Sequence, residues 1–241
     1  MSITVCTVSG KGGTGKSTVC SGLAMTAAAG GARVLIIDLD AGFRCLDTIF
    51  GIDDRVVFDL ADALKEMDIK KALYTSKCYK NIFIIPAPSV KKAIDFNSLC
   101  SLIETAKDDY DYIFLDFPAG ADFEAYSYFK DAVFLIVTGA DAVSPKAAAV
   151  ISGGLEPNVT ARLIINRFDK DMIRAGFYRN IDDIIDTALT RLIGIVPADG
   201  ELLLISQNHK IKAKGRSAKA FNRIVRRISG EDVFLPDFKK I

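Results

Sequence analysis

The stretch GKGGTGKS, residues 10–17, follows a short apolar run and precedes an alanine-rich segment. It fits G-x-x-x-x-G-K-[ST], the pattern of a loop that wraps phosphate groups between a strand and a helix. The glycines let the backbone curl so that N–H groups point at phosphate oxygens, and the helix N-terminus adds its positive end. Lys16 is expected to reach the terminal phosphates and the Ser17 hydroxyl to bind Mg²⁺. The predicted nucleotide-binding residues of this loop are Gly10, Lys11, Gly12, Gly13, Thr14, Gly15, Lys16, Ser17 and Thr18.

Apolar runs alternate with helical patterns along the rest of the chain. The predicted strands are 3–9, 33–38, 81–86, 112–116, 132–138, 161–166 and 192–197. The predicted helices are 16–29, 91–107, 144–152, 181–189 and 216–228. Because the strands are almost continuously apolar, they are expected to be covered on both faces, as in a parallel sheet. We therefore predict an α/β fold with one domain over residues 1–230, a doubly wound and mostly parallel sheet flanked by helices, and a tail at 231–241.

Three carboxylates follow predicted strands. Asp116 ends YIFLD, and Asp38 and Asp40 follow VLII. Ligands of such sheets bind at the carboxyl ends of the strands, where these residues fall. Asp116 is expected to hold Mg²⁺ through water, Asp38 to belong to the Mg²⁺ shell, and Asp40 to position an attacking water. The alternative for Asp38 and Asp40 is simple capping at the end of a strand.

Composition excludes several classes of site. The 241 residues hold 31 Lys plus Arg and 30 Asp plus Glu, a net charge of +1 that does not itself indicate a polyanionic partner. The five cysteines form no C-x-x-C pair and His209 is the single histidine, so zinc and iron–sulfur spacings are absent. The first residues enter a strand-like run that does not resemble a signal peptide. We expect a cytoplasmic protein.

Five segments carry a resemblance to a known family. They are SGKGGTGKST, LIIDLDAGFRCLD, YDYIFLDFPAG, LIINR and LIGIVPAD, in the order and spacing of the family. Over about residues 2–230 the chain resembles the deviant-Walker-A ATPases of the MinD/ParA family. The GFRCLD segment, with Arg44 and Asp47, is similar to the MinD branch rather than to plasmid ParA proteins. The resemblance implies a P-loop ATPase that binds ATP or ADP with Mg²⁺. It also assigns four residues to the adenine base: Asn166, Arg167, Pro197 and Asp199.

Lys11 is a second lysine that an ordinary phosphate loop does not need. Members of the family form an ATP-dependent homodimer in which the matching lysine reaches the partner's phosphates. The resemblance therefore implies a catalytic set of Lys11, Lys16 and Asp40, in which Lys11 also stabilises charge that develops during phosphoryl transfer. The alternative is a lysine that simply faces solvent.

Two features near the C-terminus are compatible with more than one kind of binding partner. MinD-like proteins end in an amphipathic helix that binds membrane, whereas here Pro236 interrupts a short tail containing Phe234, Leu235 and Phe238. This tail is either a weak membrane-targeting segment or packs on its own domain. A basic cluster precedes it, without an acidic residue from 202 to 230, and fits anionic lipid, DNA or solvent. The cluster consists of Lys210, Lys212, Lys214, Arg216, Lys219, Arg223, Arg226 and Arg227.

Three functions follow as hypotheses. The first is a MinD-like ATPase that dimerises on binding ATP and positions the cell-division site or another cargo, together with an activating or cargo protein. Its location is the cytoplasm, with peripheral contact at the anionic inner face of the cell membrane. The second is a ParA-like partition ATPase that binds nonspecific DNA. The third is a small-molecule P-loop enzyme, such as a dethiobiotin-synthetase-like ligase.

Overall fold

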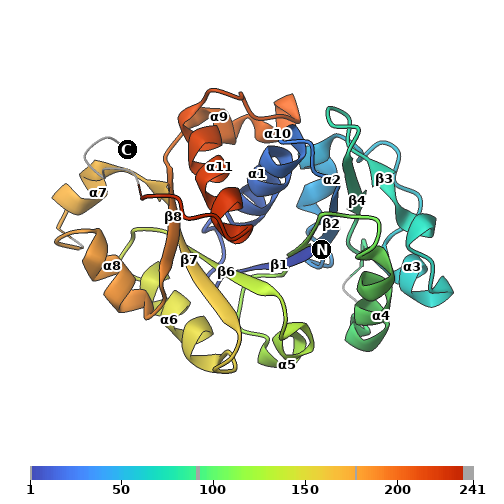
Figure 1. Cartoon of the computed structure of the whole chain (residues 1–241), viewed down its shortest axis with the longest axis horizontal. Coiled ribbons are helices and arrows are strands. Elements are labelled where there is room, and N and C mark those ends of the chain that lie inside the picture. Colours follow the sequence, from blue (N-terminus) through green and yellow to red (C-terminus); the bar gives the residue numbers. More distant parts are fainter. Residues whose placement is uncertain (1, 91–92, 177, 236–241) are drawn as a thin grey trace.

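One eight-stranded sheet runs through the computed structural model, which describes residues 2–90, 93–176 and 178–235 (Figure 1). The strand order is β3-β4-β2-β5-β1-β6-β7-β8, and every neighbouring pair is parallel except β3 with β4. The strands are β1 (Ile3–Val8), β2 (Val34–Asp38), β3 (Tyr74–Thr75), β4 (Ile82–Ile85), β5 (Tyr112–Asp116), β6 (Val133–Thr138), β7 (Thr160–Phe168) and β8 (Leu192–Pro197). The predicted mostly parallel α/β sheet is confirmed.

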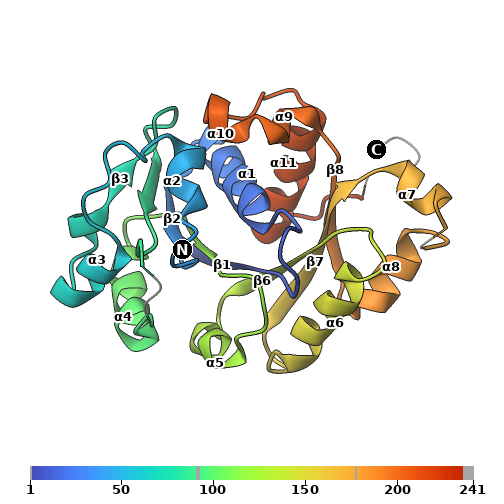
Figure 2. The same cartoon turned by 180° about the vertical axis from the view of Figure 1, so that it is seen from behind.

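Helices cover both faces of this sheet. One face carries α1 (Lys16–Ala29), α2 (Cys45–Phe50), α9 (Gly200–Leu203), α10 (Ile205–Asn208) and α11 (Arg216–Ile228) (Figures 1 and 2). The other carries α3 (Leu60–Glu66), α4 (Phe96–Ala106), α5 (Phe123–Tyr126), α6 (Ser144–Gly154) and α8 (Ile181–Ala188). The remaining short helices are η1 (Ile69–Ala72), η2 (Ser127–Phe129) and α7 (Lys170–Arg174). Two apolar cores result, one on each side of the sheet.

Each of the seven predicted strands corresponds to a strand of the sheet, with ends that differ by at most two residues. Burial on both faces explains their continuous apolar character, since every residue of β2 is buried. The helices predicted at 16–29 and 216–228 have the predicted bounds. The helix predicted at 91–107 begins only at Phe96, because Asp95 caps it by accepting from the backbone N–H groups of Asn97 and Ser98; residues 91 and 92 lie outside the described ranges.

The register of the sheet determines where the site forms. β1 lies between β5 and β6, in the middle of the sheet. The strands that follow it lie on one side of β1 and those later in the chain on the other, and sheets of this kind bind ligands at such a point, beyond the carboxyl ends of the strands. The phosphate loop follows β1 directly and opens α1. On the neighbouring strands, Asp38 at the end of β2 is in register with Asp116 at the end of β5. The pairing places two carboxylates beside the loop.

Candidate nucleotide-binding site

The loop between β1 and α1 depends on close backbone packing at two glycines. A Cβ at Gly10 would lie 2.3 Å from the carbonyl oxygen of Ala147 in α6. Gly15 has a φ of +83°, and a Cβ there would lie 2.3 Å from the Asn166 side chain. Only glycine meets both demands without strain, because it lacks a Cβ and adopts positive φ readily. These contacts hold the loop against α6 and against the end of β7.

Lys16 lies buried under the loop beside a carboxylate. Its Nζ atom is 2.8 Å from Oδ1 of Asp116 and 3.4 Å from the Ser17 hydroxyl. Burial alone would lower the pKa of Lys16, but the Asp116 carboxylate raises it, so the ammonium stays charged. Burial, followed by the charge of Asp116, raises the pKa of Asp38 to about 7. The two predicted carboxylates and the predicted lysine are therefore brought together in one interior cluster.

The oxygen atoms of this cluster suit a hard divalent cation. Oδ2 of Asp116 is buried and has no hydrogen-bond partner among the described residues. The Ser17 hydroxyl lies next to Lys16 at the start of α1, and Asp38 adds a second buried carboxylate. Mg²⁺ takes oxygen ligands and keeps several waters, so it needs few protein groups. The residues present fit Mg²⁺.

Asp38 also fixes the segment that follows β2. Its Oδ1 accepts a hydrogen bond from the Asp40 backbone N–H at 2.9 Å, and its Oδ2 accepts one from the Leu46 backbone N–H at 3.3 Å. Within the same segment Arg44 pairs with the buried Asp47 at 3.0 Å. These contacts hold the segment that contains GFRCLD. Asp38 therefore has the structural role at the end of β2 that the capping alternative describes.

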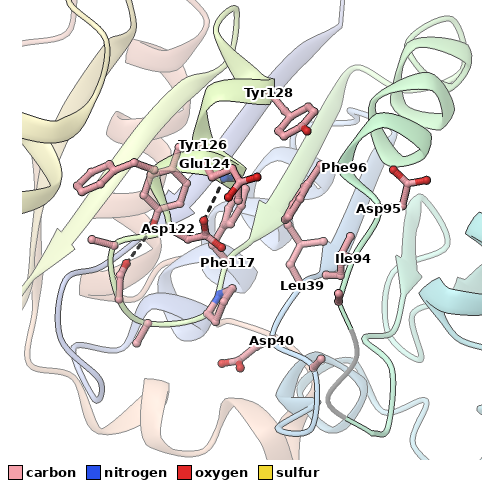
Figure 3. Close-up of a pocket in the computed structure, with 18 of the residues that line it drawn as sticks. Leu39, Asp40, Ile94, Asp95, Phe96, Phe117, Asp122, Glu124, Tyr126 and Tyr128 are labelled. Atoms are coloured by element: carbon pink, nitrogen blue, oxygen red, sulfur yellow. Dashed lines mark hydrogen bonds between the residues drawn. The ribbon is translucent and has the colours of Figure 1, made fainter.

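Asp40 is partly exposed at the edge of a cavity of about 970 Å³. Its carboxylate makes no hydrogen bond within the described part of the chain. Figure 3 shows it apart from an aromatic wall that includes Phe96, Phe117 and Tyr126. Phe117 follows Asp116 directly, and its ring is buried against the ring of Tyr126, with centroids 5.2 Å apart. Asp40 is available to contact a group that enters this cavity.

The four residues assigned to the base lie at the ends of β7 and β8. They line one hollow of about 280 Å³, together with Thr18. Asn166 and Arg167 also brace the loop, because their side chains donate to the carbonyl oxygens of Thr14 at 2.8 Å and Gly13 at 3.1 Å. Asp199 accepts from the Ser217 hydroxyl at 2.8 Å and caps α9. The structure therefore gives Asn166, Arg167 and Asp199 supporting contacts that sequence reasoning did not foresee.

Asp141 is a site residue that sequence reasoning missed. Its Oδ1 atom lies 3.3 Å from Nζ of Lys11, on the turn before α6. Burial alone would raise the pKa of Asp141, but hydrogen bonds from Ser144 and Val143 and the Lys11 contact lower it to about 2. A signal was available: an Asp often accepts hydrogen bonds from backbone N–H groups two and three residues on, and here these lie at the Ser-Pro start of a helix.

The glycine-rich loop, the buried lysine and the two in-register carboxylates define a P-loop nucleotide-binding protein. Residues 5–211 match the family model of the CobQ/CobB/MinD/ParA nucleotide binding domain. The chain belongs to this family and is a MinD-like ATPase within it. The resemblance seen in the sequence is thereby confirmed, and the ligase-like alternative is disfavoured.

Curated relatives and solved structures give the same assignment. Septum site-determining protein MinD of Helicobacter pylori is 34% identical over 99% of this chain and 95% of its own length. The protein of that name from Synechocystis is 35% identical over 95% of this chain and 90% of its own length. In the MinC:MinD cell division protein complex of Aquifex aeolicus, a chain with 30% identity superposes with a TM-score of 0.86 and covers 98% of this chain and 99% of that one.

Two further features bear on partners. In the described ranges, no helix has the length and apolarity to span a bilayer. Part of the basic cluster is engaged within the chain: Lys212 pairs with Glu201 at 2.8 Å, Arg226 pairs with Glu231 at 2.7 Å, and Arg227 donates to the Val233 carbonyl oxygen. Of the tail, Phe234 is exposed, and residues 236–241 lie outside the described ranges.

Proposed function

We propose that this chain binds ATP with Mg²⁺, dimerises in that state, and uses hydrolysis to return to the monomer while it helps to place the cell-division site. The observation that carries the proposal is that two lysines of one loop lie in different environments. Lys16 is buried beside Asp116, whereas Lys11 projects from the exposed rim with 45% of its side chain accessible. A lysine at the rim is suited to a phosphate outside its own subunit.

Within one subunit, each residue has a distinct task. The loop amides and Lys16 bind the phosphates, and Ser17, Asp38 and Asp116 hold Mg²⁺, which supplies positive charge to the phosphate oxygens. Lys16 then exchanges its Asp116 contact for phosphate, since both are anions within reach of one side chain. Asp40 orients the attacking water, and the hollow lined by Asn166 and Pro197 receives the base. MinD from Pyrococcus horikoshii, complexed with Mg-ADP, shares this fold with a TM-score of 0.77.

Between subunits, Lys11 offsets the charge of the partner's nucleotide. Two nucleotides that face each other across an interface concentrate negative charge, so each subunit must add a cation for the dimer to be stable. The same lysine stabilises charge that develops during transfer of the terminal phosphoryl group. Nucleotide state, dimerisation and hydrolysis are then linked through one side chain.

Analytical ultracentrifugation with ATP and Mg²⁺ tests the proposal. We expect the wild type to sediment as a dimer with ATP and as a monomer with ADP. Lys11→Ala should bind ATP, because Lys16 and the loop amides remain, and should stay monomeric. A Lys11→Ala protein that dimerises like the wild type would show that the lysine acts within its own subunit.

The proposal extends to the molecules that the dimer binds. The Aquifex relative was solved with MinC, and we infer that this chain also receives an activating or cargo protein in its dimeric state. Residues 1–230 would form the ATPase domain, and the tail 231–241 would give weak peripheral contact with an anionic membrane. Nonspecific DNA is the second candidate, because Lys210, Lys214, Lys219 and Arg223 make no ion pair within the described part of the chain. Co-sedimentation with anionic vesicles or with duplex DNA, each with ATP, separates the two.

A further inference from the structure

Lys11 has a partner in its own subunit. Its ammonium lies 3.3 Å from Oδ1 of Asp141, which is 130 residues away in the sequence. The two side chains belong to different parts of the site, Lys11 to the phosphate loop and Asp141 to the turn between β6 and α6. They lie at the two sides of a small hollow that Thr14 and Asn166 also line. The ion pair therefore connects the phosphate loop to α6.

Asp141 is the fixed member of this pair. Its Oδ1 atom accepts hydrogen bonds from the backbone N–H groups of Val143 and Ser144, both at 3.0 Å, and its Oδ2 atom accepts one from the Ser144 hydroxyl. These contacts satisfy two N–H groups at the start of α6 and orient the carboxylate whether or not Lys11 is present. Among the described residues the Lys11 ammonium has no other hydrogen-bond or ion-pair partner, and it sits on a long flexible stem. In an exchange of partners, Lys11 moves and Asp141 stays.

We propose that Asp141 is a positioning residue that holds Lys11 in its own subunit until the ATP of a second subunit competes for it. The proposal rests on the proposed function, since it requires that Lys11 acts across the dimer. Two ATP molecules with Mg²⁺ present more negative charge near the interface than two ADP molecules do. The contact with Asp141 therefore opposes dimerisation in both states, but only ATP overcomes it. Asp141 would thus keep the ADP-bound chain monomeric at protein concentrations at which the ATP-bound chain dimerises.

The size of the effect follows from exposure. Lys11 and Asp141 are 45% and 39% exposed, so water screens their attraction. Exposed ion pairs typically change an equilibrium by about 1.4- to 5-fold. A symmetric dimer breaks two such pairs, so the dissociation constant of the dimer should respond by roughly 2- to 30-fold. A change of this size is measurable without abolishing the monomer.

The test replaces the charge but keeps the cap. Asp141→Asn retains a side-chain oxygen for the Val143 and Ser144 N–H groups, and Asn makes the same local backbone hydrogen bonds as Asp. Asp131→Asn is the matched control: it makes the same change in net charge at an exposed carboxylate before β6, outside every ion pair of the described residues. Sedimentation velocity over a range of protein concentrations gives the dimer dissociation constant of each protein with ATP and with ADP.

We expect Asp141→Asn to tighten the ATP dimer by roughly 2- to 30-fold and to form some dimer with ADP, while Asp131→Asn matches the wild type. An unchanged or weaker Asp141→Asn dimer, with wild type and Lys11→Ala behaving as proposed, overturns the role of Asp141 alone. If the wild type fails to dimerise with ATP, or Lys11→Ala dimerises normally, the proposed function falls and this inference with it. Should Asp141→Asn lower Tm, Asp141→Ser provides a second neutral cap, for which the same expectation holds.

Discussion

At the scale of single residues, the interior pair of Lys16 and Asp116 links stability to nucleotide binding. Both side chains are almost fully buried, and the charge of each is offset mainly by the other, at 2.8 Å. Removing one member of a buried pair leaves an uncompensated charge, whereas removing both can be nearly neutral. In the proposed nucleotide complex Lys16 exchanges this partner for a phosphate, so the same pair contributes to the stability of the free chain and to nucleotide binding.

Lys16→Ala should abolish ATP binding and also lower the free energy of unfolding by about 3–5 kcal/mol, because Asp116 is left buried without a cation. The double variant Lys16→Ala with Asp116→Asn should recover most of that stability and still fail to bind ATP. Chemical denaturation and titration calorimetry give the two quantities. Normal ATP affinity in either variant would refute the assignment of Lys16 to the phosphates.

Asp40 offers the opposite case, a carboxylate with a proposed role in catalysis and little role in the fold. Its side chain makes no hydrogen bond among the described residues, and Asp38 holds its backbone. Asp40→Ala should keep its stability, bind ATP and dimerise, but hydrolyse ATP at least about 100-fold more slowly, because water positioning is lost. Single-turnover hydrolysis measures this directly. Turnover near the wild-type rate would exclude Asp40 from positioning the attacking water.

The sequence was informative about residue types and much less so about side-chain partners. Asp38 and Asp116 could be predicted because a strand followed by a carboxylate places the group at a known edge of a parallel sheet. The pairing of Lys11 with Asp141 and the bracing of Thr14 by Asn166 depend on loops that meet only in three dimensions. Strand periodicity carries no information about such contacts.

At the scale of elements, α1 and α11 pack so closely that one glycine decides the fit. A Cβ at Gly22 of α1 would lie 2.4 Å from the ring of Phe221 of α11, and Phe221 is fully buried. Because α1 follows the phosphate loop directly, this packing positions the helix that carries Lys16 and Ser17. The contact is part of the support of the binding site.

Gly22→Ala should lower the free energy of unfolding by about 1–2 kcal/mol, since overpacking outweighs the better helix propensity of alanine. Gly153→Ala in α6 is the control, because nothing lies within 4 Å of its added Cβ. That variant should be as stable as the wild type or more stable by up to about 1 kcal/mol. Urea denaturation of both proteins makes the comparison. Equal effects of the two substitutions would mean that the ring of Phe221 moves without cost.

Long elements could be predicted and short ones could not, for a physical reason. The helix at 216–228 shows its apolar period over several turns, and the helix at 16–29, which is buried on most sides, is visible as a long alanine-rich run. α9 and α10 have four residues each and β3 has two, which is too few to show a period. These elements exist because the surrounding fold supplies their contacts.

At the scale of the whole molecule, the balanced net charge of +1 conceals a functional asymmetry. The rim of the phosphate loop presents Lys11, and the proposed dimer brings two such rims to two nucleotides. In the proposed dimer, the nucleotide supplies the charge that Lys11 of the other subunit contacts. The nucleotide completes the interface, so stability and assembly become functions of the same ligand.

This coupling predicts how Tm depends on protein concentration. A ligand that binds only the folded chain stabilises it by about 2.7 kcal/mol at 100 times its dissociation constant, whatever the protein concentration. Dimerisation adds a second term that grows with protein concentration, because unfolding must first separate the subunits. With saturating ATP and Mg²⁺, the Tm of the wild type should therefore rise as the protein is concentrated, measured under conditions or with Asp40→Ala where hydrolysis is slow. With ADP, Tm should rise on ligand addition but not with protein concentration.

Lys11→Ala separates the stabilisation by ligand binding from the stabilisation by dimerisation. It should keep the rise in Tm caused by ATP, since Lys16 and the loop amides still bind the phosphates, and lose the dependence on protein concentration. Asp131→Asn, which leaves the site intact, should behave as the wild type in both respects. Differential scanning calorimetry over a hundredfold range of concentration makes the measurement. If the Tm of Lys11→Ala with ATP still climbs with concentration as steeply as that of the wild type, the cation that joins the subunits lies elsewhere in the chain.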